Sequence, residues 1–236
     1  MAEKRRIYTS FHDIPPREYM YFPKGSITVD KPGRFSRTEI IHILISMLVL
    51  TIAFSFWITG GLLFNINNIY LVAQAIPFAF AGVLTGFFFH EASHKFMAQK
   101  FGLWAEYRLY PMGLFLALII SVFTGFIFAA PGAVMFMGGS RYHENGKIAV
   151  AGPFANIIVA YVTYPLYMYV FFETTIGTIV GFICLINSFL AAFNLFPLAP
   201  LDGSKVIKWN ATVWIILLIL AILILVLIST SFVFSF

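Results

Sequence analysis

Long apolar runs, several of them about twenty residues in length, constrain this chain more than any other feature. A helix of that length crosses the hydrocarbon core of a bilayer. The ten-residue alternating segments typical of a membrane barrel are absent. Of the 236 residues, 60% are hydrophobic and 11% are charged, against about 25% charged in soluble domains. The sequence therefore predicts an all-α polytopic membrane protein.

The apolar runs divide the chain into five predicted spans and one segment of different character. The spans are residues 40–60, 69–102, 148–171, 176–196 and 213–232. The sixth apolar segment, residues 112–130, is interrupted at Thr124-Gly125 and lies between two stretches of extended character, 104–110 and 133–137. Residues 138–146 are predicted as a polar loop. We therefore expect five to six transmembrane helices plus a re-entrant segment with a small β-sheet or hairpin.

The basic residues indicate how these spans are oriented. Eight of the 15 Lys and Arg residues precede Glu39, and the rest lie within 95–108, 141–147 and 205–208. Connections at 61–68 and 172–175 carry none. Cytoplasmic loops are rich in Lys and Arg, so the net charge of +5 reports orientation rather than nucleic-acid binding. We expect a multi-pass protein of the cell membrane with its N-terminus in the cytoplasm.

Two units follow from this pattern. Residues 1–38 are predicted as a cytoplasmic N-terminal segment, in which 27–29 is a candidate short strand, and residues 39–236 as the transmembrane domain. The basic loops on both sides of 109–140 face the cytoplasm only if residues 112–137 enter the membrane and return. A single crossing is the alternative. Non-helical backbone at membrane depth must be buried in protein or line a wet cavity.

The motif His90-Glu91-Ala92-Ser93-His94 closes the apolar part of the second predicted span. Positions i and i+4 share one face of a helix, so both imidazoles can reach one metal ion, and the intervening glutamate can act as a general base. The apolar part, residues 69–89, is about 31 Å long at 1.5 Å per residue. In the predicted orientation His90 and His94 lie at its cytoplasmic end.

A third protein ligand is needed, because catalytic zinc is typically held by three side chains. The chain has three aspartates, Asp13, Asp30 and Asp202. Asp202 follows a proline-rich break at the end of the span 176–196, which runs in the same direction as the span that carries His90. We therefore predict a Zn²⁺ site formed by His90, His94 and Asp202.

This ligand set indicates hydrolysis of a peptide bond. Zinc lowers the pKa of a bound water to about 7, and Glu91 is placed to take its proton and to pass it to the leaving amine. The tetrahedral oxyanion needs a polar donor. Asn194 and Asn156 are the candidates, with a hydrogen bond at a helix end as the alternative role for each.

Three motifs together resemble those of the site-2 proteases, which are intramembrane zinc metalloproteases. They are His90-Glu91-x-x-His94, Gly152-Pro153-x-x-Asn156, and the stretch from Asn194 through Pro197 and Pro200 to Asp202-Gly203. The resemblance covers about residues 69–210. It implies zinc on the three predicted ligands, Glu91 as the base and Asn194 near the reacting carbonyl.

The resemblance also implies the partners. Substrates would be transmembrane proteins or peptides, cut within or near the lipid bilayer during regulated proteolysis, with no role for nucleic acid; the oligomeric state stays open. Because a helical substrate must unwind before hydrolysis, the extended stretches 106–110 and 133–137 are candidates to capture the unwound strand at a sheet edge.

Two other classes of function remain open. A metal transporter could use the same His90, His94 and Asp202 cluster as a transit site, although it needs no general base and often shows internal repeats, of which none is evident. The other class is an inactive membrane scaffold, against which the intact motif and Asp202 argue.

Overall fold

The structure, a computed structural model, describes residues 33–62, 68–127, 131–137 and 140–231. Within these residues five helices are long and apolar enough to cross a membrane: Arg37–Thr59, Ile69–Lys100, Tyr142–Tyr169, Thr175–Asn194 and Ala211–Ser231. The chain is therefore a multi-pass membrane protein with the helical fold predicted for it. The candidate strand at 27–29 and most of the N-terminal segment lie outside the described residues.

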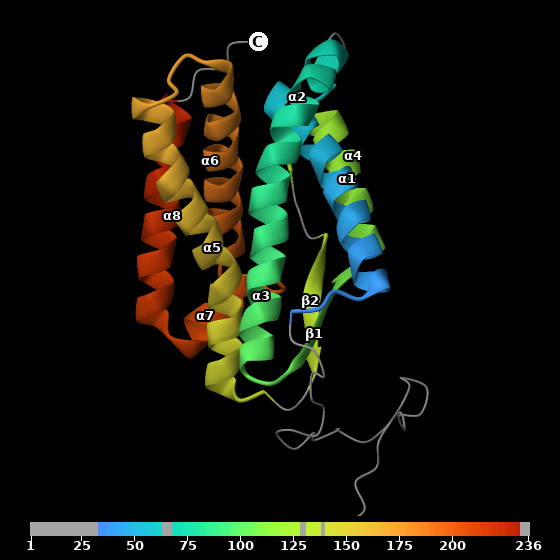
Figure 1. The fold of residues 1–236 in the computed structure, drawn as a ribbon, viewed down its shortest axis with the longest axis vertical. Helices are drawn as coiled ribbons and strands as arrows, with labels where there is room; N and C mark the ends of the chain where they lie inside the picture. Colours follow the sequence, from blue (N-terminus) through green and yellow to red (C-terminus); the bar gives the residue numbers. More distant parts are fainter. Residues whose placement is uncertain (1–32, 63–67, 128–130, 138–139, 232–236) are drawn as a thin grey trace, which may run out of the picture.

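The span Ile69–Lys100 forms the central rod of the molecule (Figure 1). On one side of this rod lie α5 (Tyr142–Tyr169), α6 (Thr175–Asn194) and α8 (Ala211–Ser231), and on the other lie α1 (Arg37–Thr59) and α4 (Pro111–Thr124). Helices α5 and α6 pack along each other, and α1 packs on α2 and α4. Buried apolar side chains such as Phe54, Phe87 and Ile186 join both sides to the rod.

The rod contains an irregular turn that the sequence did not predict. Helix α2 (Asn68–Val83) and helix α3 (Phe89–Lys100) are joined by η2 (Leu84–Phe88), a turn of π-helix. A π turn carries an extra residue relative to the α-helix and occurs often at functional sites. This one ends two positions before His90 and therefore sets the direction in which the histidines point.

The predicted excursion leaves a small sheet and returns to it. Strand β1 (Trp104–Leu109) pairs with β2 (Gly132–Met137) in antiparallel register, from Trp104 opposite Met137 to Leu109 opposite Gly132. Just beyond the sheet, the Tyr110 N–H donates to the Pro131 carbonyl over 2.8 Å. Helix α4 begins here and ends at Gly125, where the Leu62 N–H donates to the Val122 carbonyl. The excursion is thus a helix that reaches the far end of α1, after which strand β2 brings the chain back alongside β1.

The starts of two helices differ from the prediction, and one further helix is present. Residues 142–146 are not a loop, because α5 begins at Tyr142, where the Glu144 carboxylate accepts from the backbone N–H of Arg141 over 2.9 Å. Helix α1 begins at Arg37, since the Ser36 hydroxyl caps the N–H of Glu39. A short helix that was not predicted, α7 (Asp202–Trp209), connects α6 to α8.

Candidate metal centre

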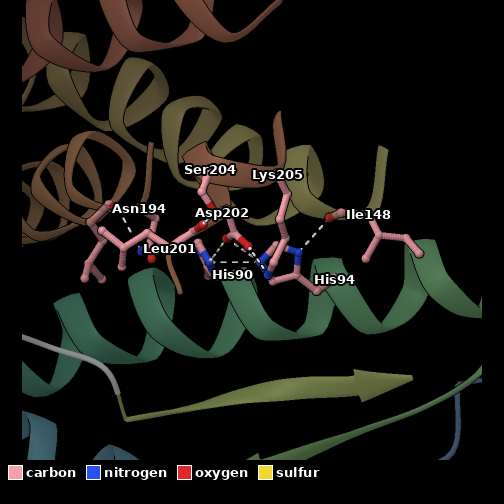
Figure 2. A network of polar contacts seen from close by, with 9 residues as sticks. His90, His94, Ile148, Asn194, Leu201, Asp202, Ser204 and Lys205 are labelled. Atoms are coloured by element: carbon pink, nitrogen blue, oxygen red, sulfur yellow. Dashed lines mark hydrogen bonds and ion pairs between the residues drawn. The ribbon is translucent and has the colours of Figure 1, made fainter. Parts of the chain in front are cut away.

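The three predicted ligands meet at one point (Figure 2). His90 and His94 lie on successive turns of α3, and Asp202 is the first residue of α7. The Asp202 Oδ2 lies 2.9 Å from the Nε2 of His94 and 3.2 Å from the Nε2 of His90, and the two Nε2 atoms are 3.0 Å apart. The structure therefore brings together residues that are 108 and 112 positions apart in the chain.

Their hydrogen bonding fits a cation at this point. The Nδ1 of His94 lies 2.7 Å from the Ile148 carbonyl, which can only accept, so Nδ1 carries the proton. In neutral His94 the Nε2 atom then presents a lone pair toward a carboxylate oxygen and a second imidazole nitrogen. Three electron-pair donors converge, and imidazole nitrogen with carboxylate oxygen is a donor set that Zn²⁺ binds. The cluster fits Zn²⁺.

The centre is shielded from solvent. The exposed fractions of His90, His94 and Asp202 are 5%, 6% and 8%. Burial by itself raises the pKa of the Asp202 carboxyl, but the positive charge that His94 carries when protonated and the hydrogen bonds with both imidazoles outweigh it and hold that pKa well below its usual range. Asp202 is therefore anionic, as a metal ligand must be.

Lys205 provides a further contact to the aspartate. Its Nζ lies 3.3 Å from the Asp202 Oδ1, the oxygen that does not face the histidines (Figure 2). The two residues are one turn apart on α7, and the lysine side chain is 53% exposed. Lys205 thus favours the carboxylate rotamer that directs Oδ2 toward His90 and His94.

Glu91 lies beside these ligands at the wall of a cavity of about 680 Å³. One of its carboxylate oxygens, Oε2, is buried without a hydrogen-bond partner. The backbone N–H of Val134 in β2 lies near this carboxylate. The cavity is lined by apolar side chains from α1, η2, α6 and the β1–β2 region, together with His90 and His94. It leaves open space beside Glu91 and the three predicted ligands.

The two asparagines occupy different environments. Asn194 lines the same cavity and donates from Nδ2 to the Leu190 carbonyl of its own helix over 3.0 Å. Asn156 is fully buried on α5, with neither amide atom hydrogen-bonded, and is not part of the cavity wall.

Three contacts of the centre were not anticipated from the sequence. The Ile148 carbonyl and the Val134 N–H are backbone groups, so no residue type marks them. Lys205 is a side chain with a recognisable signal, since it follows Asp202 by three positions and would face it on a helix. The contact between Lys205 and Asp202 could not be predicted because α7 itself was not predicted.

Two curated proteins are similar to this chain. A protein of Methanocaldococcus jannaschii named "Putative zinc metalloprotease MJ0611" is 40% identical over 185 residues, which cover 78% of this chain and 90% of the relative. A protein of Bacillus subtilis named "Putative zinc metalloprotease YwhC" is 27% identical over 165 residues, which cover 59% of this chain and 72% of the relative. No protein-family model and no solved structure matches the chain.

Proposed function

This chain belongs to the zinc metalloprotease family of its two relatives, and from that membership we propose that it is an intramembrane endopeptidase. It would hydrolyse peptide bonds of membrane-spanning substrates within or near the bilayer, as the site-2 proteases that its motifs resemble do. One observation carries the proposal. The carboxylate of Glu91, next to His90, His94 and Asp202, faces a largely apolar cavity at the end of a membrane-length helix.

The chemistry follows from the positions of the side chains. Zinc held by His90, His94 and Asp202 would act as a Lewis acid that polarises the scissile carbonyl and makes water a better nucleophile. Glu91 would take a proton from the attacking water and return it to the amine nitrogen as the peptide bond breaks. The Oε2 atom of Glu91 is buried without a hydrogen-bond partner, so this oxygen is available to the water.

Asn194 is better placed than Asn156 to donate to the developing oxyanion. A primary amide has two N–H donors, and the contact with the Leu190 carbonyl uses one of them. Because Asn194 lines the cavity, its remaining N–H can reach a substrate there. Asn156, buried away from the cavity wall, would act on the centre only through neighbouring groups.

Within the described residues the sheet has two strands, so the second edge of β2 carries no strand there, and this edge supports a mode of substrate binding. The Tyr107 N–H donates to the Glu39 carboxylate over 3.0 Å and therefore points away from β2. In an antiparallel pair, the N–H and C=O groups of two directly opposed residues point either toward each other or away from each other. Val134 is opposite Tyr107, so its backbone N–H and C=O point away from β1. The same holds for Phe136, two positions further along β2. Both line the cavity. We infer that an unwound substrate segment adds to this edge as a third strand.

We further propose that the N-terminus and the cavity mouth face the cytoplasm of a cell membrane. Arg141, Lys147, Lys205 and Lys208 are all exposed near the end of the molecule that holds the metal centre. Clustered basic residues at one end of the spans favour that orientation.

The test of the enzymatic proposal is Glu91→Gln in purified protein with a membrane-spanning reporter substrate. Glutamine keeps the size of the side chain but cannot act as a base, so we expect zinc content to be unchanged and cleavage to fall by at least about 10²-fold. Glu173→Gln, an exposed acid beyond the opposite end of α5, is the control and should cleave normally. Cleavage at the normal rate by Glu91→Gln would refute the mechanism.

Substrate binding at the strand edge needs a separate test. Phe136→Pro removes an N–H that points away from β1, whereas Phe136→Ala removes the side chain and keeps that N–H. We expect the proline variant to retain zinc and lose cleavage, and the alanine variant to retain both. Equal cleavage by the two variants would refute pairing at this edge.

A further inference from the structure

Gly152 of α5 lies directly against the two metal-binding imidazoles. A Cβ atom built on Gly152 would lie 2.3 Å from the Nε2 of His94 and 2.6 Å from the Nε2 of His90. Both distances are far below van der Waals contact. The atoms that a side chain would meet are the same two nitrogens that converge with the Asp202 Oδ2.

Neither partner has room to move away. Both imidazoles are buried, and the Nδ1 of His94 is held by the Ile148 carbonyl, one turn before Gly152 on the same face of α5. Ile148 itself is buried in a cluster with Ala98, Leu103 and Ala105, which joins α5 to the end of α3 and to β1. Packed interiors of this kind transmit a local overlap instead of absorbing it.

We propose that Gly152 is a positioning residue of the metal centre, whose bare backbone leaves the space in which the two Nε2 atoms bind the ion. Helix α5 then acts on His94 at both ring nitrogens. The Ile148 carbonyl favours the tautomer with the proton on Nδ1, and Gly152 leaves Nε2 accessible to the ion. The inference rests on the metal centre and not on where or what the protein cleaves, so its readouts are zinc affinity and thermal stability rather than proteolysis.

The first experiment compares Gly152→Ala with Gly146→Ala. Both place a methyl group on α5 against an aromatic ring, since a Cβ on Gly146 would lie 2.1 Å from Cγ of Trp209 in α7. Alanine favours a helix more than glycine does, so helix propensity does not predict a loss in either variant. We expect Gly152→Ala to bind zinc at least about 10-fold more weakly in competition with a chelator, the scale set by lost second-shell support. Gly146→Ala overlaps with Trp209 and not with the imidazoles, so it should lose clearly less affinity than Gly152→Ala.

The second experiment is independent of zinc and holds even where Gly152→Ala folds poorly. In a His90→Ala/His94→Ala background the imidazoles are gone, and with them the three atoms that lie nearest to the added methyl group. We expect Gly152→Ala to lower the melting temperature in the metal-free parent protein and to leave it unchanged in this background. An unchanged zinc affinity of Gly152→Ala, an equal loss in Gly146→Ala, or an equal fall of the melting temperature in both backgrounds would each overturn the proposal.

Discussion

Lys95 and Glu39 form an ion pair from which solvent is excluded, with exposed fractions of 1% and 0%. The lysine, next in sequence to the predicted ligand His94, also donates to the Arg34 carbonyl over 3.0 Å, and its Nζ lies 4.2 Å from the centre of the Phe35 ring. The other oxygen of Glu39 accepts from the Tyr107 N–H of β1. One buried pair therefore joins α1, α3 and the sheet.

Removing one partner of this pair should destabilise the fold strongly. Lys95→Met leaves the Glu39 carboxylate buried without its cation, and we expect a loss of about 3–5 kcal/mol in the free energy of unfolding. The double variant Glu39→Gln/Lys95→Met should recover much of that loss. Denaturant unfolding in detergent micelles measures both, with Lys100→Met, an exposed lysine on the same helix, as the control. A double variant as unstable as the single one would contradict this account.

The two oxygens of Asp202 should differ in their importance for zinc. Oδ2 faces the histidines and Oδ1 contacts Lys205. Asp202→Asn therefore removes the negative charge of the carboxylate, whereas Lys205→Met removes only the contact that orients it. We expect Lys205→Met to weaken zinc binding about 10-fold. Loss of a residue that only contacts a ligand weakens metal binding by at most roughly 100-fold, and Asp202→Asn should weaken it by more than that. Chelator competition on purified protein measures the affinities. Lys208→Met on the same helix should bind normally; a reversed order of the first two variants would contradict the assignment of the oxygens.

Removal of zinc should lower the free energy of unfolding by an amount set by the zinc concentration relative to its Kd. A ligand that binds only the folded state at 100 times its Kd stabilises that state by about 2.7 kcal/mol. We expect chelation to lower the melting temperature and added zinc to restore it in the parent protein. His90→Ala lacks a ligand and should melt at the same temperature with or without zinc. A zinc-dependent shift in that variant as large as in the parent would place the ion elsewhere.

The contact between the end of α4 and the end of α1 should depend on Gly125. This residue has φ of +64°, and a Cβ on it would lie 2.3 Å from the Gly60 carbonyl carbon. Gly102 also has a positive φ, +76°, but a Cβ there meets nothing within 4 Å. Gly102→Ala should therefore cost about 1–2 kcal/mol from backbone strain alone, and Gly125→Ala clearly more. Unfolding measurements that give equal losses would show that this close approach is not stabilising.

The sequence predicted the convergence of His90, His94 and Asp202 and the membrane-length helices, because both depend on residue type. His90, His94 and Asp202 carry electron-pair donors for a metal, and such residues are easily recognised in an apolar sequence. A run of twenty apolar residues is most simply explained by a membrane-spanning helix. The parts that it did not predict depend on geometry. The π turn at Leu84–Phe88 has no composition of its own, and helix α7 is eight residues long, too short for its periodicity to be distinguished from a loop. The support of His94 by the Ile148 carbonyl emerges only once α5 is packed on α3.

The central rod separates the groups that approach the predicted metal ligands from the proposed substrate-binding edge. Asp202 and the Ile148 carbonyl approach the histidines from the side of α5 and α7, whereas the open edge of β2 belongs to the side of α1 and α4 (Figure 1). A genetic screen should accordingly yield two kinds of inactive protein. Substitutions on the first side would produce protein that lacks the metal. Substitutions on the second side would produce protein that holds the metal but no longer binds the substrate.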